Sequence, residues 1–208
     1  MPQLQGYGLR ASEGQHEEPL SLDPGPLVPV GFALRATAQL LDLLVGFVVA
    51  FVGGVIGAVV LAVLARAGLV ADGWIERMQR VSALSLLAGT LSGIAYHTVA
   101  EGVSGVTIGK AICGMRVLAA DQRPCTIAKA FGRALAFYID SFFFGLVAYG
   151  AMNQSTMKQR LGDRWASTIV VTKSSASAIP LRNFALGTVL SIAISGLIQM
   201  VSIIASGR

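Results

Sequence analysis

Two arginine–aspartate pairs stand within apolar segments of the chain, where charged side chains need a specific explanation. Arg35 precedes Asp42 by about two helical turns, and Arg133 precedes Asp140 by the same spacing. A charged side chain inside a membrane helix costs about 2.5–3.5 kcal/mol on insertion scales, so each aspartate should face protein or water. Arg35 is one candidate partner for Asp42. Such an aspartate either changes its protonation state while a cation or proton moves, or it locks two helices together, and both alternatives stay open.

The two pairs belong to similar stretches of sequence, RATAQLLD at residues 35–42 and RALAFYID at residues 133–140. A parallel repeat of this kind would give two helices that enter from the same face of the membrane, each with its arginine at the surface and its aspartate inside. Chance similarity between short apolar segments is the alternative. The stripe that carries Asp42 continues into small residues that include Gly53 and Gly57, which is typical of close packing between helices.

The sequence lacks the patterns of common enzymes and metal sites. The segment around Gly109 is not a phosphate-binding loop, because Ser104 stands where a glycine is required and Ala111 where a hydroxyl residue would hold Mg²⁺. GxSxG, HExxH and GxGxxG are absent, and two histidines leave few ways to bind a metal. His97, one turn before Glu101, is able to transfer protons, but a lone histidine is more often a structural hydrogen-bond partner. We therefore expect no enzyme, no cofactor and no metal site.

The composition is that of a membrane protein. Hydrophobic residues make up 54% of the chain and charged residues 13%, and the mean hydropathy is +0.67. The apolar residues form long runs, as expected of helices that need about 20 residues to cross a bilayer. The net charge of +5 comes from basic residues between these runs, which favour an anionic lipid surface as partner over nucleic acid. Cys113 and Cys125 have neither disulfide nor zinc spacing.

We predict an all-α polytopic membrane protein with three core helices and an additional C-terminal transmembrane helix. Residues 1–30 are polar and proline-rich and lack the features of a signal peptide, so they are expected to form a disordered cytoplasmic tail. The membrane domain then covers residues 31–173. Its core helices are expected at 31–64, 81–100 and 130–152, and the additional helix at 184–206 follows a linker at 174–183.

The loops between these helices are basic, and two of them contain strand-like runs. Lys110 and Lys158 lie in the loops on either side of the third helix, and we predict that both are cytoplasmic, as is the N-terminus. One full span cannot have both ends on one face, so we favour a broken, re-entrant third helix that bends near Gly145; failure of the charge rule is the alternative. The runs at 115–120 and 168–172 are expected to form a short β pairing in a cytoplasmic subdomain.

Three blocks of the sequence resemble the RDD family of membrane proteins. The pair Arg35 and Asp42 matches the first-helix pattern of that family, and residues 159–163, QRLGD, with the following T-x-V-V run match its closing pattern. The loop GVTIGKAICGMRV matches the pattern G-x-T-x-G-K-x-x-x-G-x-R-V at Gly105, Thr107, Gly109, Lys110, Gly114, Arg116 and Val117. Ile108 departs from the common proline and Gln122 from the common glycine of this loop.

The resemblance covers residues 31–173 and implies a membrane location and three core helices. It implies that Asp163 is the second family aspartate, with Asp140 a further acidic position, and that the function is often suspected to be transport rather than enzymatic. We also expect Asp163 to meet Lys110 or Arg116 in the cytoplasmic subdomain.

Two functions from different classes fit these observations. In the first, slightly favoured, Asp42 and Asp140 change protonation during cation- or proton-coupled transport while Arg35 or Arg133 tunes them. In the second, the chain is a non-catalytic scaffold or regulatory module for partner membrane proteins in the cell membrane. Three or four helices are few for a carrier unless the protein forms a homo-oligomer.

Overall fold

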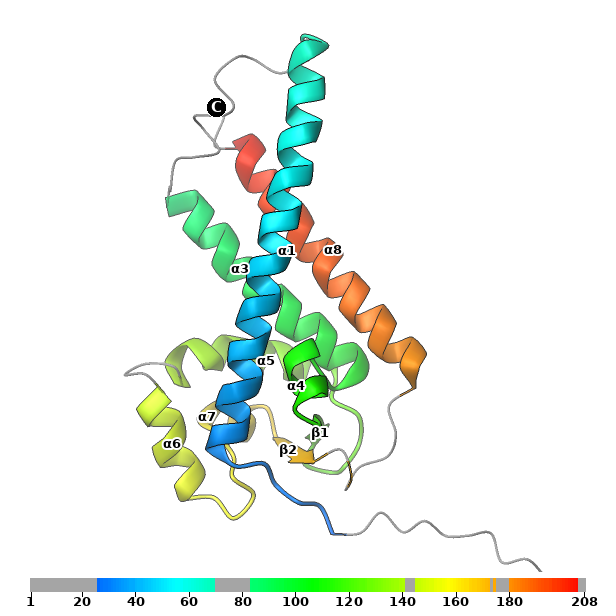
Figure 1. Ribbon diagram of the computed structural model, residues 1–208. Coiled ribbons are helices and arrows are strands. Elements are labelled where there is room, and N and C mark those ends of the chain that lie inside the picture. The colour runs from blue at the N-terminus through cyan, green and yellow to red at the C-terminus, as the bar shows by residue number, and fades with distance from the viewer. Residues whose placement is uncertain (1–25, 70–82, 141–144, 173, 175–179, 206–208) are drawn as a thin grey trace, which may run out of the picture.

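The computed structural model describes residues 26–69, 83–140, 145–172, 174 and 180–205 (Figure 1). Three long helices dominate this part of the chain: α1 (Phe32–Arg66), α3 (Ala83–Ser104) and α8 (Leu181–Ala205). Each contains a stretch long and apolar enough to cross a membrane, judged by length and composition. The predicted all-α polytopic fold is confirmed, and these helices begin and end within a few residues of the predicted positions.

The C-terminal helix α8 packs along α3 through paired serines. The Ser92 hydroxyl donates to the carbonyl oxygen of Ser195 at 3.2 Å, and the Ser195 hydroxyl donates to the carbonyl oxygen of Ser92 at 3.0 Å. Gln199 Nε2 donates to the Ser92 hydroxyl at 3.3 Å. Hydrogen bonds of this kind join helices where lipid offers no polar partner. The polar face of α8 is therefore docked within the chain.

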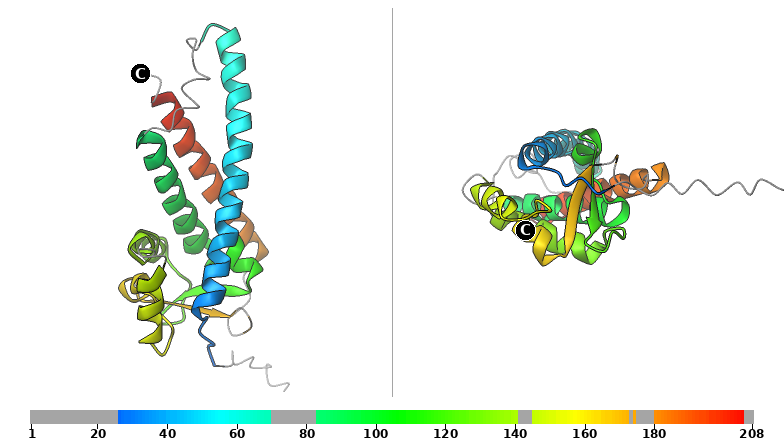
Figure 2. Two further views of the ribbon diagram at one scale, coloured as in Figure 1. Left: turned by 60° about the vertical axis from the view of Figure 1, so that its left-hand side comes forward. Right: turned by 90° about the horizontal axis from the view of Figure 1, so that it is seen from below.

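The predicted third core helix is broken. α5 (Ile127–Asp140) has 14 residues and α6 (Leu146–Asn153) has 8, and Gly145 before α6 has a φ of +82°, a left-handed conformation that favours glycine. Neither helix reaches the length of about 20 residues that a span requires. The fold therefore has the favoured break near Gly145 in place of one continuous helix over residues 130–152, whereas re-entry of this segment into the membrane stays a prediction. α5 lies across the ends of the long helices rather than along them (Figures 1 and 2).

A small antiparallel sheet closes the same end of the bundle. β1 (Met115–Ala119) pairs with β2 (Thr168–Thr172), so the predicted β pairing is confirmed. A short helix precedes each strand, α4 (Ile108–Ile112) before β1 and α7 (Leu161–Trp165) before β2. We use the term basal subdomain for α4, β1, α5, α6, α7 and β2.

Residues just before α1 add to the other edge of β2. The amide of Val30 donates to the carbonyl oxygen of Val170 at 3.0 Å, and the amide of Thr172 donates to the carbonyl oxygen of Val28 at 3.0 Å. Val30 also packs in the hydrophobic core beside Val117. The expectation of disorder up to residue 30 is therefore wrong at its end, and residues 1–25 lie outside the described range. Half of the predicted linker, residues 175–179, also lies outside it, and α8 begins before the linker's expected end.

Candidate functional site

A buried carboxylate joins two arginines where the long helices meet the basal subdomain. Asp163, in the first turn of α7, accepts hydrogen bonds from Arg35 of α1 and from Arg133 of α5. Arg35 also donates to the carbonyl oxygens of Val30 at 3.0 Å and Lys158 at 2.8 Å. Asp163 is only 1% exposed. Its carboxylate therefore fastens α1 and α5 to one turn of α7.

Glu101 extends these contacts into α3. Arg133 Nε donates to Glu101 Oε2 at 3.0 Å, and Lys110 Nζ donates to Glu101 Oε1 at 2.6 Å. His97 Nδ1 lies 3.7 Å from the same Oε1, one helical turn away. The charged residues are all buried, so they form a continuous polar connection inside the protein. We use the term charge network for Arg35, Asp163, Arg133, Glu101 and Lys110.

The central pair of this network stays ionised. Burial by itself would raise the pKa of Asp163, but Arg133 and Arg35 outweigh it and hold this pKa well below its usual range. Burial would lower the pKa of Arg133, but Asp163 and Glu101 outweigh it and raise this pKa above its usual range. The two groups therefore act as a fixed ion pair at physiological pH and not as proton carriers.

Asp42 is held by neutral donors rather than by an arginine. The Tyr96 hydroxyl donates to Oδ1 at 3.0 Å, the Thr107 hydroxyl donates to Oδ2 at 2.6 Å, and the amide of Gly109 donates to Oδ1 at 2.8 Å. Asp42 is 4% exposed, which agrees with the expectation that it faces protein. Arg35, one candidate for its partner, binds Asp163 instead, and the polar side chain that reaches Asp42 from the second long helix is Tyr96.

Asp42 and Asp140 make the same contact at two places in the fold. Each accepts a hydrogen bond from the amide of the glycine at the second position of a five-residue helix. Gly109 of α4 lies 2.8 Å from Asp42, and Gly162 of α7 lies 3.2 Å from Asp140. Each short helix then leads into one of the two paired strands. The same order of elements therefore occurs twice. A helix that carries an aspartate (α1 or α5) is followed, further along the chain, by a short helix with the contacting glycine (α4 or α7) and then by a strand (β1 or β2).

Both glycines are required by the close approach of the helix that carries the aspartate, α1 for Gly109 and α5 for Gly162. A Cβ on Gly109 would lie 2.1 Å from the carbonyl oxygen of Ala38, and a Cβ on Gly162 would lie 2.8 Å from the Cβ of Ala136. Ala38 and Ala136 occupy the same place in RATAQLLD and RALAFYID. The sequence similarity therefore coincides with a repeated structural contact, which favours a true internal repeat over chance.

A comparison with known families agrees with this arrangement. A sequence profile of the RDD family matches residues 29–167, which include Arg35, Asp42, Asp163 and all of α4. The chain belongs to the RDD family. Together with the three apolar long helices, this places the protein in a membrane. No curated protein and no solved structure matches the chain.

The loop motif of this RDD protein shapes the turn from α4 into β1. The Thr107 side chain caps α4 by accepting a hydrogen bond from the amide of Lys110 at 3.3 Å. Gly114, at the turn into β1, has a φ of +65°. The side chain of Arg116 packs beside Gly105, which leaves no room there for a larger residue. Of the two partners expected for Asp163, Lys110 and Arg116, Lys110 is excluded because its ammonium group binds Glu101.

Two parts of the site were not predicted from the sequence. Glu101 was noted only as a neighbour of His97, although an acidic residue at the end of an apolar run was itself a signal for a buried partner. The contacts of Tyr96 and Thr107 with Asp42 had no such signal, because these residues belong to different elements that only the fold brings together. In the described part of the chain, no three His, Cys, Asp or Glu side chains are placed to hold a metal ion.

Asp140 differs from the other buried acids. Its Oδ2 accepts from Gly162, whereas its Oδ1 has no hydrogen-bond partner within the residues that the structure describes. Burial raises the pKa of Asp140, and the amide of Gly162 opposes this shift only in part. Asp140 therefore takes up a proton more readily than an exposed aspartate, in contrast to Asp163.

Proposed function

We propose that this RDD protein is a non-catalytic module that presents its basal subdomain to partner membrane proteins at the cytoplasmic face of the cell membrane. The observation that carries the proposal is the position of Asp163, whose carboxylate ties Arg35 and Arg133 together. In a transporter, such charged groups would bind the cargo. Here the two arginines and the carboxylate bind one another. Their role in this proposal is to hold the basal subdomain rigidly on the long helices.

The energies involved favour a fixed role for these groups. Removing one partner from a buried ion pair costs about 3–5 kcal/mol, and a cargo ion would have to supply that energy at each turnover. Asp42 is similarly committed, because each of its three hydrogen bonds contributes about 1.5–3 kcal/mol when the acceptor is charged. A carboxylate with such partners serves as an anchor for α4.

The orientation follows from the positive charges of the basal subdomain. Lys110 and Lys158 both belong to this end of the bundle, although they flank the broken third helix in sequence. An excess of lysine and arginine near membrane helices favours the cytoplasmic side. This supports a basal subdomain that faces the cytoplasm, where it can contact partners.

A flux assay separates the proposal from transport. Purified wild-type protein and Asp42→Asn are reconstituted in proteoliposomes that report cation and proton flux, and the melting temperature of each is measured in detergent. We expect no flux above that of empty liposomes and a lower melting temperature for Asp42→Asn. Asp121→Asn, at a side chain 58% exposed, is the matched control. Wild-type flux that Asp42→Asn abolishes without any change in melting temperature would overturn the proposal.

Photo-crosslinking tests the partner directly. A photoreactive residue is placed at Leu146, which is 66% exposed on α6, and in a second variant at Ala148, which is 4% exposed on the same helix. In native membranes we expect an adduct of one defined mass from position 146 and none from position 148. If adducts form only between copies of the chain, the partner is a second copy of this chain and not a different protein.

Proton-coupled transport is the second candidate, and Asp140 is the observation that favours it. Its Oδ1 lacks a partner among the described residues, and a separate series of polar contacts runs from Gln39 to His97 (3.3 Å) and on to Glu101 (3.7 Å). In this case Asp140→Asn and His97→Gln would each reduce pH-dependent flux while leaving the melting temperature within about 2 °C of wild type.

A further inference from the structure

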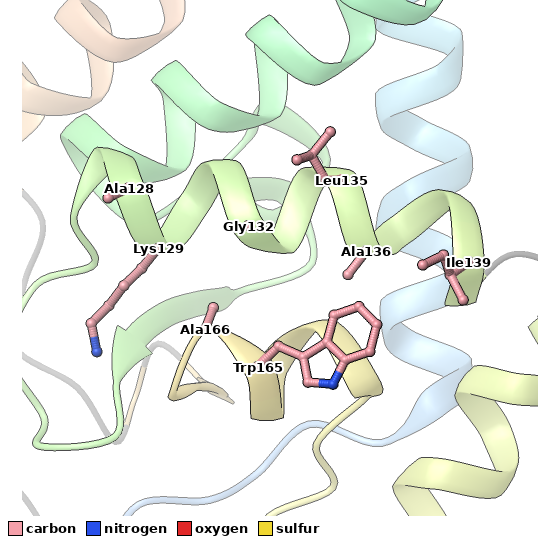
Figure 3. A pocket seen from close by; sticks show the side chains of 8 residues that line it. All are labelled: Ala128, Lys129, Gly132, Leu135, Ala136, Ile139, Trp165 and Ala166. Atoms are coloured by element: carbon pink, nitrogen blue, oxygen red, sulfur yellow. The ribbon is translucent and has the colours of Figure 1, made fainter.

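A groove separates α5 from α7 at the level where the long helices meet the basal subdomain (Figure 3). Its volume is about 480 Å³, within the range of about 300–1,000 Å³ that small-molecule sites occupy. The residues that line it are mostly small or apolar and include Ala128, Lys129, Gly132, Ala136, Ile139 and Trp165. Nothing in the charge network or in the contacts of Asp42 uses this groove.

The groove adjoins the apolar face of α5. Five large apolar or aromatic side chains of this helix are 42–50% exposed, and at 100° per residue they fall within an arc of about 120°. Arg133 and Asp140 lie on the opposite, buried face. A helix with one apolar and one charged face that lies across the ends of spanning helices fits the boundary between lipid and water. The exposed residues are Ile127, Phe131, Leu135, Tyr138 and Ile139.

Trp165 and Lys129 supply the two kinds of contact that a lipid needs at this boundary. The indole of Trp165 is 65% exposed and lies across the groove from α5 (Figure 3). Tryptophan is enriched at the level of lipid headgroups because its ring is apolar and its N–H is polar. Lys129 lines the same groove and donates one hydrogen bond to the carbonyl oxygen of Ser167 at 3.1 Å. Its ammonium group retains two further donors for an anionic oxygen.

We propose that the groove between α5 and α7 binds one anionic phospholipid of the membrane leaflet nearest the basal subdomain. One acyl chain lies along Ile139 and Trp165, and the phosphate lies beside Lys129. The occupant is a lipid because the groove is continuous with the apolar face of α5, and it is anionic because the cationic Lys129 lines the groove. The site depends on the membrane location of the chain and not on the proposed scaffold function.

Quenching of tryptophan fluorescence tests this site with phosphatidylglycerol as the probe. The chain has two tryptophans, Trp74 and Trp165, so Trp74→Phe leaves Trp165 as the single reporter. Full-length protein in detergent is titrated with phosphatidylglycerol brominated on its acyl chains, and separately with brominated phosphatidylcholine. We expect saturable quenching by phosphatidylglycerol at one lipid per chain, with an apparent affinity at least threefold higher than for phosphatidylcholine.

Two variants and two matched controls assign the effect to the groove. A Cβ on Gly132 meets nothing within 4 Å, so the side chain of Gly132→Leu has room to enter the groove and should abolish saturable quenching. Gly150→Leu, in an equally open position on α6, should leave it unchanged. Lys129→Gln should remove the preference for phosphatidylglycerol, whereas Arg123→Gln, at a side chain 83% exposed, should keep it.

Several results would overturn the proposal. Quenching that rises without saturation and equally for both lipids would mean that Trp165 contacts only bulk lipid or detergent. Quenching that survives Gly132→Leu would place the lipid elsewhere. If quenching of Trp165 decreases as the protein concentration rises, whichever lipid is present, a second copy of the chain covers the groove.

Discussion

Asp163→Asn is the most informative single change in the charge network. The variant keeps the size of the side chain but replaces one of the carboxylate oxygens that bind Arg35 and Arg133 with an amide N–H group. Arg133 still has Glu101 at 3.0 Å, so its charge remains paired. Arg35 keeps only the carbonyl oxygens of Val30 and Lys158 among its described partners. The cost of the change therefore falls mainly on Arg35.

Its magnitude follows from these contacts. Leaving one partner of a buried ion pair without its counter-charge costs about 3–5 kcal/mol. Each kcal/mol corresponds to about 2–4 °C in the melting temperature of a chain of about 150–250 residues, so a loss of at least about 6 °C is expected. Because the pKa of Asp163 is lowered in the folded state, the stability it contributes is present above the unfolded-state pKa of about 3.9 and is lost as the pH falls below it.

Thermal unfolding in detergent between pH 2 and pH 8 measures both effects. The double variant Arg35→Gln with Asp163→Asn completes a cycle, and it should cost less than the sum of the two single changes, because the charge stranded by either one is gone. Asp121→Asn on the surface, where an exposed pair contributes about 0–1 kcal/mol, is the control. A melting temperature of Asp163→Asn within 2 °C of wild type at pH 7 would refute a structural role for this carboxylate.

Three further predictions concern other parts of the same end of the fold. The raised pKa of Asp140 means that the stability of the wild type relative to Asp140→Asn should increase as the pH falls from 7 towards about 3.9, which unfolding at several pH values measures. Gly109→Ala should destabilise the fold by about 3 kcal/mol, because its Cβ would strike a backbone oxygen 2.1 Å away, whereas Gly150→Ala on α6 should be neutral in the same melting assay. Burial raises the pKa of Cys125 to about 11, so maleimide at pH 7 should label Cys113 at least tenfold faster, as peptide mass spectrometry would show.

Sequence patterns located most of the elements because the bilayer leaves few choices for apolar runs. Spans about 20 residues long could only become helices, and α1, α3 and α8 are where those runs predict them. The strand-like runs beside them also pair as expected, because pairing supplies the hydrogen bonds that buried backbone N–H and C=O groups need. α5 was harder to place, because its apolar face resembles that of a span while Arg133 and Asp140 face the protein.

The partners of the buried charges could not be predicted from spacing along one helix. Arg35 and Asp42 share a stripe of α1, and that proximity suggested a pair. In the fold, α4 approaches α1 so closely that the amide of Gly109 reaches Asp42. Once that carboxylate is satisfied by neutral donors, Arg35 pairs with Asp163 from the far end of the chain. Such contacts depend on tertiary packing, which composition and periodicity do not specify.

The ion pairs exchange charges between the two copies of the internal repeat. Arg35 belongs to the first copy and binds Asp163 of the second, while Arg133 of the second copy binds Glu101 of the first. The strands repeat this exchange, because β1 of the first copy pairs with β2 of the second. Arg133 also binds Asp163 within its own copy, whereas among the described residues Arg35 finds its carboxylate partner only in the second copy. The strand pairing and the Arg35–Asp163 ion pair therefore join the two copies, and the buried charges lie where the copies meet.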